Sequence, residues 1–243
     1  MKRFFVKGNL SVGDTFKIDG IEHNHIKNVM RLNIGDEIIL VRGDEYDYFA
    51  VIENMSKGDT VVRISRREEN IYNATSNVAV FQALVKSDNM NLIIQKLTEL
   101  GVKDFYPFES EFITSKDKFG KTDKMQEVSN QSIKQCKRSI PMEVHNTLSF
   151  KDMLSVISEY DVIIFANECE RQDKLNVSKD TLGNKKVAIV VGSEGGFSES
   201  EINSLKCIGA KSVTLGKRIL RAETATIALT SVVMFAMGEW DYE

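Results

Sequence analysis

A glycine-rich bend joins an apolar run to an acidic segment in VAIVVGSEGGFSESEI, residues 187–202. Bends of this kind bind phosphates, form hydrolase nucleophile turns, or let a ligand approach the backbone closely. No lysine stands near this one, and its Gly-x-x-Gly-Gly spacing differs from that of a dinucleotide-binding loop. Glu194, Glu199 and Glu201 would also repel a phosphate at the start of the next helix. The bend therefore does not favour a phosphate ligand.

A hydrolase nucleophile at Ser193 is excluded by the order of residues along the chain. In that fold the catalytic histidine follows the serine. All three histidines precede it, at His23, His25 and His145. His23 and His25 are two residues apart on a predicted helix and point to different faces, so we do not expect them to bind a metal together.

The remaining use of the bend is close approach of a flat or cationic ligand to the backbone. Gly192, Gly195 and Gly196 carry no side chain that would block such a ligand. The neighbouring carboxylates would stabilise a ligand that carries positive charge. S-adenosylmethionine is an adenosine with a positively charged sulfonium, so it meets both conditions: a flat part and a cationic part. The alternative is a plain strand-to-helix turn in which Ser198 caps the helix and Glu201 closes a capping box. The cap alone does not explain the glycines, so a ligand site is favoured.

A second motif lies in VTLGKRILRAETATIALTSVVMFAMGEW, residues 213–240. A strand is expected to end at Leu215, and the loop 216–223 carries Lys217, Arg218 and Arg221. Surface ion pairing accounts for Arg218, whereas Arg221 lies between apolar residues and favours a role in a site. The helix expected from Thr224 to Gly238 is too short to span a bilayer, so it must be buried by the core or by another subunit.

The elements that position these motifs fall into two parts, and the fold class is α/β. Strand-like runs at 3–6, 37–41, 46–52 and 60–64, with one helix near 21–32, predict a small β-barrel in residues 1–70. Ile26, Val29 and Met30 are expected on one face of that helix. The polar segment 67–77 is interpreted as a linker. From residue 74 to 243 apolar strands alternate with helices, which predicts a parallel sheet covered on both faces. Ligands of such sheets bind beyond the carboxyl ends of the strands.

Composition indicates a soluble, cytoplasmic globular protein of 243 residues, with 42% hydrophobic residues and a formal charge of -3. No uncharged apolar run is long enough to cross a membrane. The cysteines, Cys136, Cys169 and Cys207, match no zinc spacing and are expected as reduced thiols packed as small apolar groups. No metal is expected.

A local basic patch occupies residues 116–138. It holds seven basic side chains against three acids, a local charge of +4. The basic residues are Lys116, Lys118, Lys121, Lys124, Lys134, Lys137 and Arg138. The patch is either a solvated helix face or a contact surface for nucleic acid.

Both motifs together resemble the RsmE family of 16S ribosomal RNA methyltransferases, in the SPOUT superfamily. The resemblance covers the whole chain in order. The stretches MKRFFV and HNHIKNVMRLNIGDEI are similar to the family's PUA-like RNA-binding barrel, and NMNLIIQKLTELGV to the first helix of its catalytic domain. The stretches VVGSEGGFSESEI and LGKRILRAETA are similar to its two cofactor-loop signatures.

The resemblance implies a PUA-like barrel at 1–70 and a SPOUT domain at 74–243 whose sheet ends in a trefoil knot. It implies S-adenosylmethionine bound in that knot, a homodimer, and methylation at N3 of a uridine in the decoding region of 16S rRNA. Two alternatives stay open. One is a SPOUT enzyme with another target, a ribose 2′-hydroxyl or a tRNA base. The other is a non-catalytic RNA-binding assembly factor.

The resemblance also implies three cofactor loops. These are Phe165, Ala166, Asn167 and Glu168; then Gly192, Glu194, Gly195 and Gly196; then Leu215, Gly216, Ile219, Leu220 and Arg221. This chain departs from the pattern at Ser193, where proline is expected, and at Phe112, where the family commonly has arginine.

The expected chemistry requires a group that stabilises the anion of the uracil ring. A guanidinium beside O2 or O4 would do so, and Arg221 is the candidate. Glu194 and Glu223 are the nearby carboxylates that could take the N3 proton. Phosphates are expected to meet Arg3, Lys27 and Arg31 of the barrel and Lys134, Lys137 and Arg138 of the basic helix.

Overall fold

The computed structural model describes residues 1–113, 122–168 and 177–241, which form two compact units. The first unit is Met1–Asn73 together with Asn130–Pro141, and the second is Ala74–Ser129 together with the chain from Met142 onward. From the sequence, 130–141 was predicted to belong to the second domain. The structure groups this segment with the first unit, where Ile133 is buried against Ile39 and Val41.

The first unit is built on a five-stranded sheet in the order β1-β3-β4-β5-β2. Its strands are β1 Lys2–Phe5, β2 Thr15–Asp19, β3 Glu37–Val41, β4 Tyr46–Met55 and β5 Asp59–Glu69. β1 pairs with β3 in parallel, and the other pairs are antiparallel. The predicted strands are present, and β2 is an addition whose polar sequence gave little signal. The described ladder contains no pairing between β1 and β2, so the barrel is left open between them.

The helix expected near 21–32 is shorter and irregular. It consists of α1, Gly20–Asn24, followed by the π-helical turn η1, His25–Val29. The amide of Met30 donates to the carbonyl of His25 at 2.8 Å, five residues back, and this widens the last turn. Ile26 is fully buried as predicted, whereas Val29 is 61% exposed, so the expectation for Val29 was wrong.

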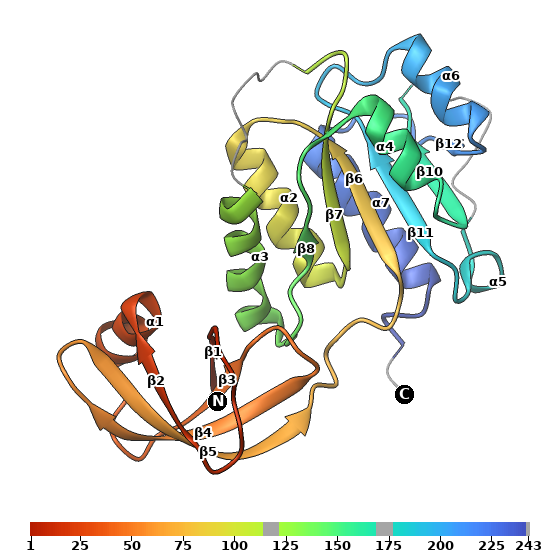
Figure 1. The fold of residues 1–243 in the computed structure, drawn as a ribbon. Coiled ribbons are helices and arrows are strands. Elements are labelled where there is room, and N and C mark those ends of the chain that lie inside the picture. Colours follow the sequence, from red (N-terminus) through yellow and green to blue (C-terminus); the bar gives the residue numbers. More distant parts are fainter. Residues whose placement is uncertain (114–121, 169–176, 242–243) are drawn as a thin grey trace. The chain divides into compact units, whose positions relative to one another are not determined.

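The second unit is a parallel sheet in the order β12-β10-β11-β6-β7-β8, with β9 also pairing with β7 (Figure 1). Its strands are β6 Val78–Ala83, β7 Asp104–Glu109, β8 Glu143–Val144, β9 Leu148–Ser149, β10 Val162–Ala166, β11 Val187–Val191 and β12 Lys211–Val213. Parallel pairing is the arrangement that the alternation of strands and helices predicted.

Both faces of this sheet are covered by helices, as Figure 1 shows. Val78 and Val80 of β6 pack on one side with α2, Ser87–Leu100, and α7, Ala222–Ala236. Ala79 and Phe81 pack on the other with α4, Phe150–Ile157, and α6, Glu199–Cys207. The period of two along a strand thus divides the apolar residues between two cores. The described residues also form α3, Thr122–Cys136, and α5, Lys179–Leu182.

The apolar helix α7 is buried along one face only. Leu229, Val233 and Met234 are fully buried in the core, whereas Phe235 is 61% exposed. Among the described residues, no helix is both long enough and apolar enough to cross a bilayer.

Candidate active site

A cavity of about 720 Å³ lies beyond the carboxyl ends of β10, β11 and β12, in the second unit. Loops that follow these three strands form most of its wall. The rest comes from Lys86 and Asn89 at the start of α2 and from the first turn of α7. Parallel strands bring their carboxyl ends to one edge, which explains why residues so distant in sequence meet here.

The cavity brings together every residue proposed for the cofactor loops except Phe165 and Gly195, and all three proposed catalytic residues. Phe165 is fully buried in the core, where its ring packs edge-on against Phe197 with centroids 6.0 Å apart. A side chain at Gly195 would place its Cβ 2.8 Å from the Cβ of Phe112. Gly195 therefore packs against Phe112 and not against the cavity.

The glycine bend is a tight turn that also contacts the loop after β10. The amide of Gly196 donates to the carbonyl of Ser193 at 3.0 Å, and Gly196 adopts a positive φ of 71°. A Cβ at Gly196 would lie 2.6 Å from a carboxylate oxygen of Glu168. The absence of a side chain at Gly196 thus lets Glu168 approach the bend.

The predicted helix cap is confirmed beside the bend. Ser198 accepts from the amide of Glu201 at 3.2 Å, and the Glu201 carboxylate accepts from the amide of Ser198 at 2.9 Å. The same buried carboxylate also accepts from the amide of Glu111 at 2.9 Å and from the hydroxyl of Ser110 at 3.2 Å. The cap therefore holds the chain after β7 as well as the start of α6.

The two carboxylates proposed as proton acceptors differ in environment. Glu223, in the first turn of α7, is only 8% exposed, and its Oε2 has no hydrogen-bond partner among the described residues. Glu194 is exposed on the bend. A buried carboxylate oxygen without a donor is unfavourable unless a ligand supplies one, which favours Glu223 as a group that meets the substrate.

Arg221 occupies the N-cap position of α7, two residues before Glu223. Its side chain is exposed at the cavity wall and forms no ion pair with the residues that the structure describes. The guanidinium is therefore available to a ligand in the cavity.

Lys86 and Asn89 line the cavity but were not predicted from the sequence. Lys86 precedes α2, on the segment that follows the carboxyl end of β6. The rule that ligands gather at this edge of a parallel sheet was the available signal. The loop after β6, residues 84–86, contains no glycine and was not predicted to be part of the site.

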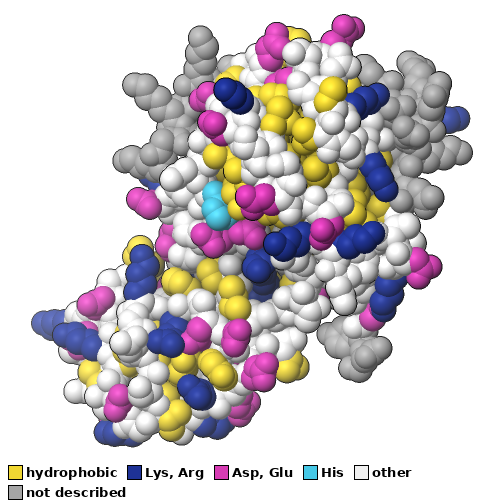
Figure 2. Space-filling model, turned by 45° about the vertical axis from the view of Figure 1, so that its right-hand side comes forward, with side chains coloured by type: hydrophobic (Ala, Val, Ile, Leu, Met, Phe, Trp, Pro, Cys, Tyr) yellow, Lys and Arg dark blue, Asp and Glu magenta, His cyan; other side chains and the backbone are white. Residues whose placement is uncertain are grey.

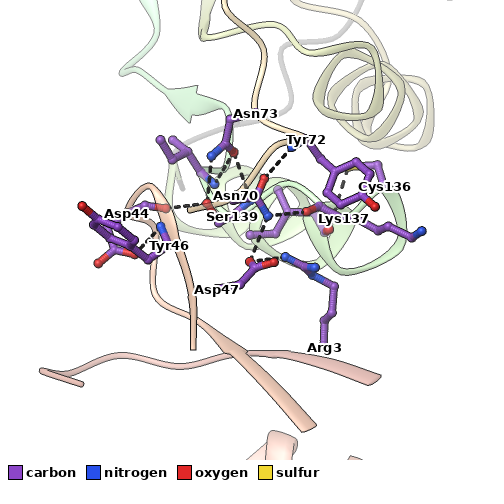
Figure 3. Close-up of polar contacts among 12 residues, drawn as sticks. Arg3, Asp44, Tyr46, Asp47, Asn70, Tyr72, Asn73, Cys136, Lys137 and Ser139 are labelled. Carbon is purple, nitrogen blue, oxygen red and sulfur yellow. Dashed lines mark hydrogen bonds and ion pairs between the residues drawn. The ribbon is translucent and has the colours of Figure 1, made fainter. Parts of the chain in front are cut away.

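The residues expected to contact RNA phosphates divide into buried and exposed groups. Arg3 is 9% exposed and paired with Asp47, as Figure 3 shows, and Lys134 is paired with Glu22 on α1. Lys27 donates to the carbonyl of Ser56 at 2.5 Å.

Among the remaining candidates, Arg138 is only 5% exposed, whereas Lys137 and Arg31 are exposed. RNA binding by all six residues stays a prediction. The burial favours a structural role for Arg3, Lys134 and Arg138.

The basic patch is only partly within the described residues. Lys116, Lys118 and Lys121 lie outside them, as does Cys169. Figure 2 shows acidic and basic side chains interspersed on the visible face, without a continuous basic field among the described side chains. Cys207 is exposed, so the expectation that it packs as an apolar group was wrong.

Comparison with known proteins identifies the family. A model described as an RNA methyltransferase domain matches residues 73–234, and one described as an RNA methyltransferase PUA domain matches residues 18–65. Ribosomal RNA small subunit methyltransferase E of Aquifex aeolicus is 34% identical, over 65% of this chain and 68% of that protein. The chain belongs to the RsmE family of RNA methyltransferases.

Further RsmE proteins match the chain over nearly its whole length. The one from Mesomycoplasma hyopneumoniae is 29% identical over 94% of this chain and 97% of that protein. The crystal structure of RsmE from Neisseria gonorrhoeae bound to S-adenosyl methionine has a TM-score of 0.87 and 28% identity, over 98% of each chain. The similarity therefore extends to the first unit, which is the PUA-like domain expected from the sequence.

Proposed function

We propose that this protein methylates N3 of one uridine in the decoding region of 16S rRNA, with S-adenosylmethionine as the methyl donor. The observation that carries the proposal is that exposed Arg221 and buried Glu223 both line one glycine-lined cavity. The names of the RsmE relatives support small-subunit rRNA as the substrate, and the cofactor in the Neisseria structure supports the methyl donor.

The residues present fit S-adenosylmethionine. The cavity volume lies within the range usual for sites of small molecules, about 300–1,000 Å³. Gly192, Gly196 and Gly216 expose backbone along its wall, and Glu168 and Glu194 place negative charge where a sulfonium would be stabilised. When bound, the cofactor supplies a methyl group on a positively charged sulfur. Ala166, Asn167, Leu215 and Leu220 would complete the binding loops.

Glu223 and Arg221 prepare the acceptor. Uracil N3 carries a proton, and N3 is a poor nucleophile until that proton is removed. Glu223 lines the cavity and its buried Oε2 lacks a donor, so its carboxylate is our candidate to accept that proton while the N–H bonding pair stays on the ring. The Arg221 guanidinium then stabilises the negative charge that spreads onto O2 and O4. Stacking hides N3 in a duplex, so the base must be splayed out before it can enter the cavity.

The remaining expectations belong to the same proposal. Exposed Lys137 and Arg31 would contact RNA phosphates. No metal is needed in this mechanism, because a carboxylate takes the proton and a guanidinium stabilises the charge that develops. An apolar surface formed by Val232, Phe235 and Trp240, each at least 40% exposed, favours a homodimer through α7. A substrate in the ribosome favours a cytoplasmic location. The trefoil knot that the family resemblance implies stays a prediction.

Two measurements test the proposed function. Calorimetric titration with S-adenosylmethionine should show one site per chain. Nucleoside mapping of 16S rRNA from a deletion strain should show loss of one N3-methyluridine, restored by the wild-type gene. Loss of a ribose methylation or of a tRNA modification instead would contradict the assignment of the target. Absence of cofactor binding would favour a non-catalytic assembly factor.

A further inference from the structure

Gln82 is a fully buried polar residue in the apolar strand β6. The described residues of the strand around it are all buried, so the amide is shielded from bulk solvent. A buried side-chain amide needs partners for both its N–H groups and its carbonyl, because each unpaired group destabilises the fold. The hydrogen-bond partners of Gln82 therefore indicate the role of this residue.

The amide nitrogen of Gln82 holds the end of β11. It donates to the carbonyl of Gly192 at 3.1 Å and to that of Ala83 at 3.0 Å, with the carbonyl of Val191 at 3.5 Å. The ladder between β6 and β11 ends at the Gln82–Val191 pair. The side chain thus supplies a donor to the first residue of the glycine bend, just where the backbone ladder stops.

The carbonyl oxygen of Gln82 holds the start of α7. It accepts from the hydroxyl of Thr226 at 2.5 Å, and Thr226 is fully buried. The Thr226 hydroxyl also lies 2.8 Å from the carbonyl of Ala222, in the turn that carries Glu223. One amide therefore joins the bend at Gly192 to the first turn of α7.

We propose that Gln82 and Thr226 are positioning residues that fix the bend and the first turn of α7 relative to each other. Neither side chain lines the cavity, so neither is a candidate for contact with cofactor or uridine. Their hydrogen bonds connect the segments that carry Gly192 and Glu223, which both line the cavity. An apolar pair of similar volume would fill the same space but would leave the two walls free to shift. The catalytic part of this proposal rests on the proposed function.

The test replaces each polar group by an apolar one of similar size. Gln82→Met and Thr226→Val should each weaken S-adenosylmethionine binding about tenfold in calorimetry, which is the effect of about one lost buried hydrogen bond. The double variant should be little worse than Gln82→Met alone, because Gln82→Met already removes the hydrogen bond to Thr226. Thr226→Ser keeps the hydroxyl and should bind like the wild type.

Thr98→Val is the matched control. Thr98 is also fully buried on a helix, and its hydroxyl donates to the carbonyl four residues back, Ile94, at 2.8 Å. It contacts Ser129 and lies outside the cavity wall. This variant should lose stability while its cofactor affinity is unchanged. If Gln82→Met and Thr226→Val behaved like Thr98→Val, with lower melting temperatures and wild-type affinity, the positioning role would be refuted.

Hydrogen exchange separates this proposal from the proposed function. Gln82→Met should raise amide exchange in both 192–197 and 222–226, and Thr226→Val should do the same, with or without cofactor. If the wild type bound no cofactor, the proposed function would fail, and the coupled exchange would still decide the role of the pair. Faster exchange in only one of the two segments would overturn the coupling.

Discussion

The hydroxyl of Ser193 donates to the backbone carbonyl of Phe112 across 2.9 Å and also accepts from the amide of Gly195 at 3.3 Å. These are the two positions at which the chain departs from the family pattern, and the fold places them in contact. A proline at 193 would have no hydroxyl to donate. The serine therefore ties the glycine bend to the segment after β7 by a bond that the expected residue cannot make.

Replacing this serine tests how firmly the bond holds the bend. Ser193→Ala should lower the free energy of unfolding by about 1 kcal/mol, the usual contribution of one hydrogen bond, and weaken cofactor binding a few-fold. Denaturant titration and calorimetry measure the two effects. Ser204→Ala on α6, whose hydroxyl bonds to the carbonyl of Ser200 at an exposed position, should change neither by a comparable amount.

Arg221→Ala should leave a folded protein that binds cofactor and methylates about a hundred-fold more slowly or worse. That is roughly the effect of losing one donor that stabilises developing charge. Turnover on small subunits and calorimetry give the two quantities. Lys211→Ala, which removes an exposed charge from the start of β12, should be fully active. Near-normal turnover in Arg221→Ala would remove this residue from the mechanism.

The two candidate bases are distinguished by amide substitutions of equal size. Glu223→Gln should reduce turnover by about 10²–10⁴-fold, the range for a lost acid–base group, while cofactor binding persists. Glu194→Gln should have a much smaller effect on turnover, since Glu194 is exposed on the bend. The reverse order in single-turnover assays would assign the proton to Glu194.

Phe235→Asp should weaken the proposed dimer, because it places a charge in the apolar surface proposed to be buried between subunits. Sedimentation velocity at several concentrations should show the dimer weakened at least about tenfold. Ile34→Asp introduces the same charge at an apolar side chain that is 63% exposed in the first unit, and should leave the dimer intact. A wild type that sediments as a monomer would contradict the dimer itself.

Substitution of Lys137 should affect RNA binding, whereas substitution of Lys134 should affect the stability of the fold. Lys137 is exposed, so Lys137→Ala should reduce the slope of log affinity against log salt by about one unit. Lys134 is paired with Glu22, with both side chains nearly buried. Lys134→Ala should therefore lower the free energy of unfolding by roughly 1–3 kcal/mol, because it leaves a carboxylate without its partner. Lys185→Ala in the second unit serves as the exposed control, and a salt slope unchanged in Lys137→Ala would exclude that phosphate contact.

Local spacing in the sequence determined most of the fold and much of the site. The alternation of apolar strands with helices, the stop of α2 at Gly101 and the capping box of Ser198 with Glu201 all depend on residues close together in the chain. The glycines at 192 and 196 could likewise be identified from the sequence, because a bend with no room for a side chain requires glycine.

Only the tertiary structure decided which residues contact one another. Phe165 is buried in the core, and Lys86 lines the cavity. Arg3 and Lys134 form ion pairs with carboxylates that are distant in the chain. The tertiary structure also matched Gln82 with Thr226, two polar residues that look out of place in apolar segments when each is read alone. Periodicity records which face of an element avoids water. It does not record which element packs on that face. The hydrogen-bond partner of a buried polar group depends on that element, so the sequence pattern alone does not predict the partner.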